Sequence, residues 1–257
     1  MWKACNPLGT LYNPLSIAEA LDMMLNEEKG AEIFESTLFQ ANNIWNSNKF
    51  DSSFSSTERS DCIQEFTERQ QILIENLTIG QQLIITFGTS YAYYLVGEDT
   101  PVGNCHKLPA SLFHRKRLSI EEIYSIWTSQ IERLKKRFPD IRIIFTVSPV
   151  RHLKDGFTGN SRSKAVLMLA IEEILKKEES CLYFPAFEIL NDDLRDYRFY
   201  ASDLAHPSNE AIDYVWEKFL DTFVDPRGRK FLEEGSRTYK AIHHLPKLGA
   251  LGKKLNP

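Results

Sequence analysis

Asp203 and His206 place a carboxylate and an imidazole three residues apart, immediately before a strongly amphipathic stretch of chain. An Asp that holds a His ring in this way prepares the imidazole to act as a general base for a nucleophile supplied from elsewhere in the fold. The first turns of the chain contain no serine that such a pair would serve. The sequence therefore predicts a general base and leaves its nucleophile open.

The elements that hold this pair in place are helices and strands, which alternate along the chain. Asn13 and Pro14 are typical of a helix start, because Asn caps free N–H groups and Pro lacks an N–H that the first turn leaves unused. The segments 55–58 and 119–122 have the Ser-x-x-Glu spacing of a capping box. With the apolar periodicity, these signals predict helices at about residues 15–26, from the first box to 77, from the second box to 138, and at 161–177 and 208–223.

Three short apolar runs, at residues 83–87, 141–147 and 181–184, have the composition of buried parallel strands. Strands alternating with helices of this length form crossover units that put helices on both faces of one sheet. The expected fold class is therefore α/β, a three-layer αβα arrangement around a parallel sheet. Residues 27–54 are rich in Phe and Trp without a clean period, and we interpret them as an insertion that packs its aromatic side chains onto the main body.

The carboxyl ends of parallel strands form the edge at which such sheets bind ligands. Gly88-Thr89-Ser90 follows the first strand, Ser148-Pro149 follows the second, and the loop with Asp203 and His206 comes after the third. We expect these segments to share one rim.

Composition excludes several classes of function. A formal charge of -4 gives no electrostatic footprint for nucleic acid. The chain as written shows no signal peptide and no run of about 20 apolar residues, so we expect a cytoplasmic protein without a membrane partner. The four cysteines lack paired spacing, which fits a reducing compartment. Cys105-His106 lacks the spaced partners of a zinc centre, and we expect no metal and no cofactor.

Several multi-residue blocks follow one another in a characteristic order. They are Asn6-Pro7-Leu8-Gly9 with Tyr12-Asn13-Pro14, Gly88-Thr89, Asn104-Cys105-His106-Lys107, Asp196-Tyr197-Arg198-Phe199-Tyr200 and Asp203-Leu204-Ala205-His206-Pro207. Together, from about residue 6 to residue 224, they resemble the GSCFA domain family. That family is similar to the SGNH hydrolases, a flavodoxin-like αβα group of serine esterases and acyl hydrolases. Its members begin with a strand ending in a Gly-Ser-Cys-Phe-Ala block, and the printed chain starts just after the place where that block would lie.

The resemblance implies roles for individual residues. It makes His206 the general base and Asp203 the group that orients its ring. Gly9 corresponds to a glycine whose backbone N–H helps to line an oxyanion hole. The amide donor of that hole has two candidates, Gly88-Thr89-Ser90 after the first strand and Asn104 in the later block, and we prefer Asn104, with Gly88 and Thr89 as further oxyanion or substrate contacts. Where the family shows a His in the tryptophan-containing insertion, this chain has Asp51 after Trp45.

Three hypotheses account for the nucleophile. In the first, an upstream segment supplies a central first strand and its serine. Without that strand, backbone groups of the neighbouring strands would lack hydrogen-bond partners. In the second, the chain is a catalytically inactive relative that binds a ligand or partner. In the third, Cys5 replaces the serine, which would require a neighbouring group that lowers the pKa of its thiol.

The chain divides into a predicted domain at 1–224 and a basic C-terminal extension at 225–257, with a short helix at about 231–234. The expected substrate is a small-molecule or carbohydrate-linked acyl ester. Whether water or another alcohol accepts the acyl group stays open, so acyl transfer on the same fold is a further alternative.

Overall fold

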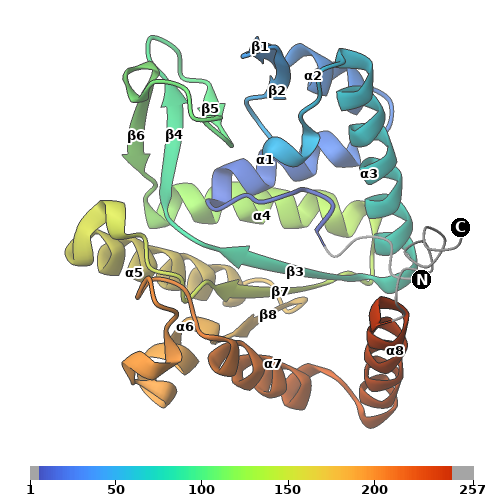
Figure 1. Ribbon diagram of the computed structural model, residues 1–257, viewed down its shortest axis with the longest axis vertical. Coiled ribbons are helices and arrows are strands. Elements are labelled where there is room, and N and C mark those ends of the chain that lie inside the picture. Colours follow the sequence, from blue (N-terminus) through green and yellow to red (C-terminus); the bar gives the residue numbers. More distant parts are fainter. Residues whose placement is uncertain (1–5, 245–257) are drawn as a thin grey trace, which may run out of the picture.

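The computed structural model describes residues 6–244 (Figure 1). The helices are α1 Pro14–Leu25, α2 Gly30–Ser36, α3 Arg59–Gly80, α4 Ile120–Arg137, α5 Gly156–Leu175, α6 Ala186–Glu188, α7 Asn209–Phe223 and α8 Pro226–His244. The strands are β1 Leu38–Ala41, β2 Ile44–Ser47, β3 Gln82–Phe87, β4 Tyr91–Leu95, β5 Pro101–Val102, β6 Phe113–Arg117, β7 Arg142–Val147 and β8 Cys181–Phe184. Short 3-10 turns or a π turn lie at Ser52–Phe54, Ala110–Leu112, Leu153–Asp155, Ile189–Leu194 and Tyr197–Phe199.

The central sheet is parallel and has the order β3-β7-β8, with Gln82 to Phe87 of β3 paired in register with Arg142 to Val147 of β7. Helices α1 and α4 lie on one side of this sheet and α6 and α7 on the other (Figure 1). The protein is therefore an α/β protein with a three-layer αβα arrangement, as the alternation of apolar runs and amphipathic helices predicts.

Aromatic side chains fill the larger of the two layers of core. The fully buried Trp127 of α4 lies with its ring centroid 5.2 Å from those of both Phe87 and Phe145. Its Nε1 donates a hydrogen bond of 3.1 Å to the Pro14 carbonyl, which fixes the start of α1 against α4. On the opposite face Phe184 packs against α7, 5.1 Å from Phe219. Both faces of β7 and β8 are thus covered.

The predicted insertion is more regular than expected. It contains α2 and a β1–β2 hairpin whose turn residues, Asn42 and Asn43, both have positive φ, at 52° and 61°. This is the backbone of a two-residue hairpin turn that Asn tolerates. Its aromatic side chains do pack onto the body, because Phe34 stacks on Phe66 of α3 with centroids 4.5 Å apart.

The sequence patterns indicate no helix or strand between residues 90 and 119. The structure nevertheless has a three-stranded antiparallel sheet there, with the order β5-β4-β6. The register pairs Tyr91 with Arg117 and Leu95 with Phe113. Because several of the outward-facing residues of β4 and β6 are aromatic or basic, the apolar and polar alternation that reveals a strand is weak here.

Helix boundaries were predicted unevenly. The capping box at Ser119 and Glu122 is present, with both reciprocal bonds. The one expected at 55–58 is not, because α3 begins at Arg59 after Glu58, which makes no side-chain cap bond. Helix α5 begins at Gly156, earlier than predicted, and α8 is a helix of 19 residues where only a short one was expected.

The sheet shows no empty central position between the described strands. Strand β3 pairs directly with β7 over six residues, so no gap separates these two strands. The outer edge of β3 has no strand partner in the described part of the chain. On the α7 side of this strand Ile84 is 53% exposed, whereas Ile85 on the other face is 4% exposed.

Candidate functional site

A short loop between the turn at Tyr197–Phe199 and α7 presents the predicted acid and base. Nδ1 of His206 lies 2.6 Å from Oδ2 of Asp203. The other carboxylate oxygen accepts the backbone N–H groups of Ala205, at 2.9 Å, and His206, at 3.0 Å. These backbone bonds, followed by the bond to the His206 ring, lower the pKa of Asp203 to about 2. The carboxylate is therefore ionised at neutral pH.

The contact with Asp203 fixes the orientation of the His206 ring. With Nδ1 against the carboxylate, the Nδ1–H tautomer is favoured and the lone pair remains on Nε2. Within residues 6–244 nothing hydrogen-bonds to Nε2, and the side chain is 63% exposed. The pair thus has the geometry of a general base that an Asp orients.

Backbone contacts hold this loop closed. The Ala201 N–H donates to the His206 carbonyl at 2.8 Å, and Tyr200 and Pro207 form an isolated bridge. Leu204 takes φ of 55°, the left-handed conformation that this tight turn requires. Ser208 then caps α7 by accepting from the Ala211 N–H. The amphipathic helix that follows the motif therefore begins where the sequence indicates.

Arg151 joins the loop to the end of β7. Its backbone N–H donates to the Ala205 carbonyl at 3.0 Å and its guanidinium to the Leu204 carbonyl at 3.2 Å. The guanidinium also lies over the Tyr200 ring, 4.0 Å from its centroid. The segment after β7 and the Asp203–His206 loop are thus adjacent. This agrees with the expectation that these segments lie at the same rim of the sheet.

Lys164 is the main residue of this rim that sequence reasoning missed. It is 1% exposed, and its Nζ donates at 2.6 Å to the carbonyls of Gly88 and Ser148, the residues that follow β3 and β7. Burial lowers the pKa of Lys164 to about 7. The available signal was its position three residues before Leu167, on the apolar face of α5.

His152 lies at the same place. Its Nε2 would be 3.5 Å from a Cβ added to Gly88, and its ring meets that of Tyr12 edge to face with centroids 6.2 Å apart. Burial and then the neighbouring Lys164 lower the pKa of His152. A neutral imidazole and a buried amine therefore lie beneath the strand ends.

Gly88 and Thr89 follow β3 at the predicted position. Both of their backbone N–H groups donate to the Tyr12 carbonyl, at 2.7 and 3.0 Å. The Thr89 hydroxyl lies 3.1 Å from that of Ser163 on α5. Contact of Gly88 and Thr89 with substrate stays a prediction, and a backbone contact would require these amides to leave Tyr12.

Gly9 lies in a tight turn beside the insertion. Its N–H donates to the Asn6 carbonyl at 3.1 Å. Two observations require glycine at this position: its φ is 69°, and a Cβ added here would lie 2.7 Å from the carboxylate of Asp51. Burial of Asp51 opposes its ionisation, but hydrogen bonds from Ser53 and Thr10 outweigh burial and lower the pKa of Asp51. Asp51 is thereby engaged in holding the turn. The oxyanion role of Gly9 stays a prediction.

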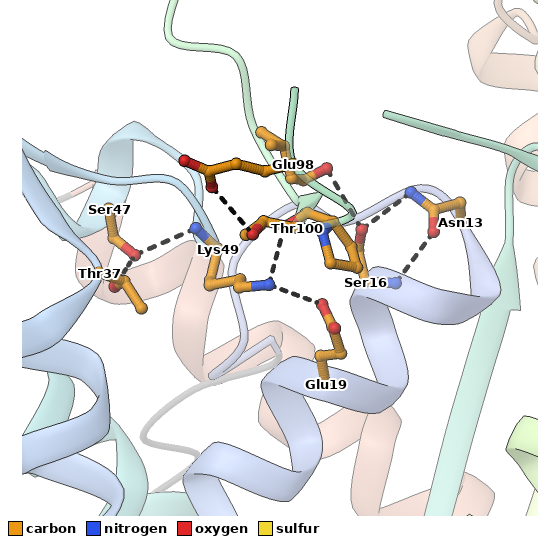
Figure 2. A network of polar contacts seen from close by, with 10 residues as sticks. Asn13, Ser16, Glu19, Thr37, Ser47, Lys49, Glu98 and Thr100 are labelled. Carbon is orange, nitrogen blue, oxygen red and sulfur yellow. Dashed lines mark hydrogen bonds and ion pairs between the residues drawn. The ribbon is translucent and has the colours of Figure 1, made fainter. Parts of the chain in front are cut away.

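A polar network positions the segment that leads to Asn104. Lys49 of the insertion donates a hydrogen bond of 3.0 Å to Glu19 of α1 (Figure 2). It also donates to the Pro101 carbonyl of β5, at 2.7 Å. Burial raises the pKa of Glu19, and the charge of Lys49 partly counters the effect. Next along the chain, Gly103 donates to the Asn48 carbonyl at 2.7 Å.

Asn104 is held by its side-chain oxygen. Its Oδ1 accepts the His106 N–H at 2.8 Å. Its Nδ2 donates no hydrogen bond to any residue in the described part of the chain. His106 in turn directs Nε2 to the carbonyls of Ser47 and Phe50. Asn104 therefore has an amide N–H free for a ligand. Its role as oxyanion donor stays a prediction.

The cysteines of the described chain are free thiols, and burial raises the pKa of each of them. Cys62 and Cys181 are buried. Cys5 lies outside the described residues, so the structure says nothing of its proposed role. Among the side chains that the structure describes, there is no group of three or more His, Cys, Asp or Glu that could hold a metal ion. No described helix has the length and apolarity needed to cross a membrane.

The fold and this rim define an α/β protein with an Asp–His pair beside the carboxyl ends of a parallel sheet. The chain belongs to the GSCFA family, whose family model matches residues 1–219. Neither the curated proteins nor the solved structures contain a match to it.

Proposed function

We propose that the chain carries the acid–base pair of a serine-type acyl hydrolase that acts on an ester or acyl group, with His206 as general base and Asp203 orienting it. The observation that supports this function is the 2.6 Å contact between Asp203 and Nδ1 of His206, with Nε2 left exposed. In this proposal Nε2 takes the proton of the serine hydroxyl as its oxygen attacks the acyl carbonyl, and then gives that proton to the leaving group.

We also propose that Asn104 stabilises the oxyanion of this reaction, and its free amide N–H supports that role. An amide N–H can hold the negative oxygen of the tetrahedral intermediate without itself titrating. Asn104→Asp would replace this donor by an acceptor, and such a loss typically lowers kcat about 100-fold or more. The attacking hydroxyl is assigned to none of the described residues, and the acceptor of the acyl group, water or another alcohol, is left open.

Hydrolysis of p-nitrophenyl acetate by the full-length protein expressed from its own gene tests this function. The matched control for His206→Asn is His114→Asn, because His114 lies on β6, where it stacks on Tyr94 with centroids 5.2 Å apart. We expect His206→Asn to lower kcat about 100-fold or more, since that is the usual contribution of a general base, and the control to retain activity.

Two outcomes would contradict the proposal. Undiminished turnover in the His206→Asn protein would remove this imidazole from the mechanism. A folded wild-type protein that hydrolyses none of a series of p-nitrophenyl esters would favour the alternative, an inactive relative that only binds its ligand.

A further inference from the structure

A pocket of about 220 Å³ lies beside the loop that carries the base. Arg151 is the direct link, since it lines the pocket and hydrogen-bonds to Leu204 and Ala205, the two residues before His206. The pocket is lined by Arg151, Leu153, Gly156, Phe157, Asn160, Ser161, Phe187, Asn191 and Tyr197. This lining contains one cation and no carboxylate.

The guanidinium of Arg151 is held in place without being neutralised. The Leu204 carbonyl accepts one of its N–H groups, and the rings of Tyr200 and Tyr197 lie 4.0 and 5.6 Å from the guanidinium carbon. It forms no ion pair with any carboxylate in residues 6–244. The remaining N–H groups are therefore available to a ligand that accepts hydrogen bonds, and a guanidinium binds carboxylate and phosphate groups with two parallel bonds.

Among the acids close in sequence to the pocket, Asp192 beside Asn191 is exposed and forms no ion pair with Arg151, and three others already have partners. Asp155 pairs with Arg115 at 2.5 Å, and Asp203 holds His206. Asp196, beside Tyr197, lies 3.9 Å from Arg198 and also accepts its backbone N–H. None of them is left to neutralise Arg151.

The other walls of the pocket supply donors and apolar surface. Asn160 accepts the His152 N–H with its Oδ1 at 3.0 Å, which leaves its NH₂ group without an acceptor in the described residues. The Ser161 hydroxyl likewise has no hydrogen bond there. Phe157 and Tyr197 are 79% and 67% exposed. Exposed rings next to unused donors fit a ligand with both an apolar part and an anionic part.

We propose that this pocket binds a negatively charged group of the substrate, a carboxylate or a phosphate, through Arg151, while the ester bond at the other end of the same molecule reaches His206. The inference rests on the proposed function because it treats the pocket as part of the same centre. It narrows the substrate from any acyl ester to an anionic one.

Binding measured by nuclear magnetic resonance titration of the full chain tests the pocket without needing turnover. The probes are monomethyl glutarate for a carboxylate, glycerol 3-phosphate for a phosphate and dimethyl glutarate as the neutral counterpart. We expect one of the anions to bind at least about tenfold more tightly than the neutral probe, because charge-assisted bonds to an arginine are the strong ones. Which anion binds identifies the source of the charge.

Ser161→Glu is the principal variant, because it places an acid in the lining without touching the loop that Arg151 holds. Arg162→Gln changes the net charge by the same amount on the next residue of α5 but does not line the pocket. We expect Ser161→Glu to weaken the anionic probe about tenfold or more, and Arg162→Gln to leave it within about twofold. Arg151→Gln should abolish the preference for the anion.

The inference is overturned if neither anion binds more tightly than dimethyl glutarate, or if Ser161→Glu and Arg162→Gln behave alike. These results are separable from a failure of the proposed function. Anion binding by a protein that hydrolyses no ester would count against the hydrolase and not against the pocket, whereas an active enzyme without anion binding would remove the pocket alone.

Discussion

Lys164 is a buried cation of the rim, with a side chain that is 1% exposed. A lysine ordinarily has a pKa of 10.5, and burial here lowers it to about 7. A neutral amine still has two N–H groups, which match the two carbonyls of Gly88 and Ser148 that it contacts. Lys164 can therefore join the ends of β3 and β7 whether or not it carries a charge.

This environment predicts a pH dependence of stability. Between pH 7 and pH 10.5 the unfolded chain binds a proton at Lys164 that the folded chain does not, so stability must rise with pH across that interval. We expect the free energy of unfolding of the wild type, relative to Lys164→Met, to increase by about 2 kcal/mol from pH 7 to pH 9. Urea unfolding of both proteins at the two pH values measures it. A difference that stays constant or falls would contradict the lowered pKa.

The contrast between Lys164 and His206 shows which site residues a sequence can reveal. Asp203 and His206 meet because they lie three residues apart in one loop, and such spacing is readable. Lys164 meets Gly88 across 76 residues and Ser148 across 16. Lysines are mostly exposed, so the residue type predicts the opposite of what the fold imposes, although Lys164 lies on the apolar face of α5.

At the scale of elements, β3 is the strand whose two faces differ most in their surroundings. Ile84 and Ile85 are neighbours in sequence but point to opposite faces of the sheet. We expect Ile84→Lys to lower the free energy of unfolding by less than about 1 kcal/mol, since a half-exposed Lys on a strand keeps its water. Ile85→Lys should cost more than about 3 kcal/mol, because it buries an unpaired charge.

Chemical denaturation of the two variants makes this comparison with the same substitution at adjacent positions. Equal and large losses in both would show that the α7 side of β3 is covered in the folded protein, contrary to the exposed fraction of Ile84.

Elements whose signals are local were predicted, and elements that depend on distant pairing were not. The helix starts at Asn13, Ser119 and Ser208 are all confirmed, with each side chain accepting a backbone N–H, because a cap needs only the next three residues. The β4–β6 pairing brings Tyr91 to Arg117 across a long connection. Nothing near either strand in sequence encodes that register.

At the scale of the whole molecule, α8 is the least integrated part of the described chain. Among its described side chains, Arg229 pairs with Asp221 and Glu217 of α7. In Figure 1 it stands beyond the end of α7, away from the three layers. The domain division at residue 224 stays a prediction.

Removing residues 225–257 tests that division. We expect the shortened chain to unfold in one cooperative step, with a free energy of unfolding within about 1 kcal/mol of that of the full chain, because exposed ion pairs contribute little. Calorimetry with circular dichroism measures both. Loss of cooperative unfolding would show that α8 is part of the core domain.

The three-layer class could be predicted from the sequence because strand composition and helix periodicity agree along the chain. The arrangement of the rim could be predicted only in outline. The carboxyl ends of parallel strands had to meet, and Arg151 and Lys164 do join the segments that follow β3 and β7 to the Asp203–His206 loop. The bonds of Gly88 and Thr89 to Tyr12 could not be foreseen, since no local pattern connects positions 76 and more residues apart.

Labelling of the full-length protein with a fluorophosphonate probe tests whether Asp203 and His206 activate a serine, because the probe reacts with a serine only when a base activates it. We expect mass spectrometry to find one labelled serine in the wild type, and we expect both His206→Asn and Asp203→Asn to abolish the label while His114→Asn retains it. Labelling that persists without His206, or a folded wild type that takes up no probe, would contradict the assignment of Asp203 and His206 as an acyl-transfer base.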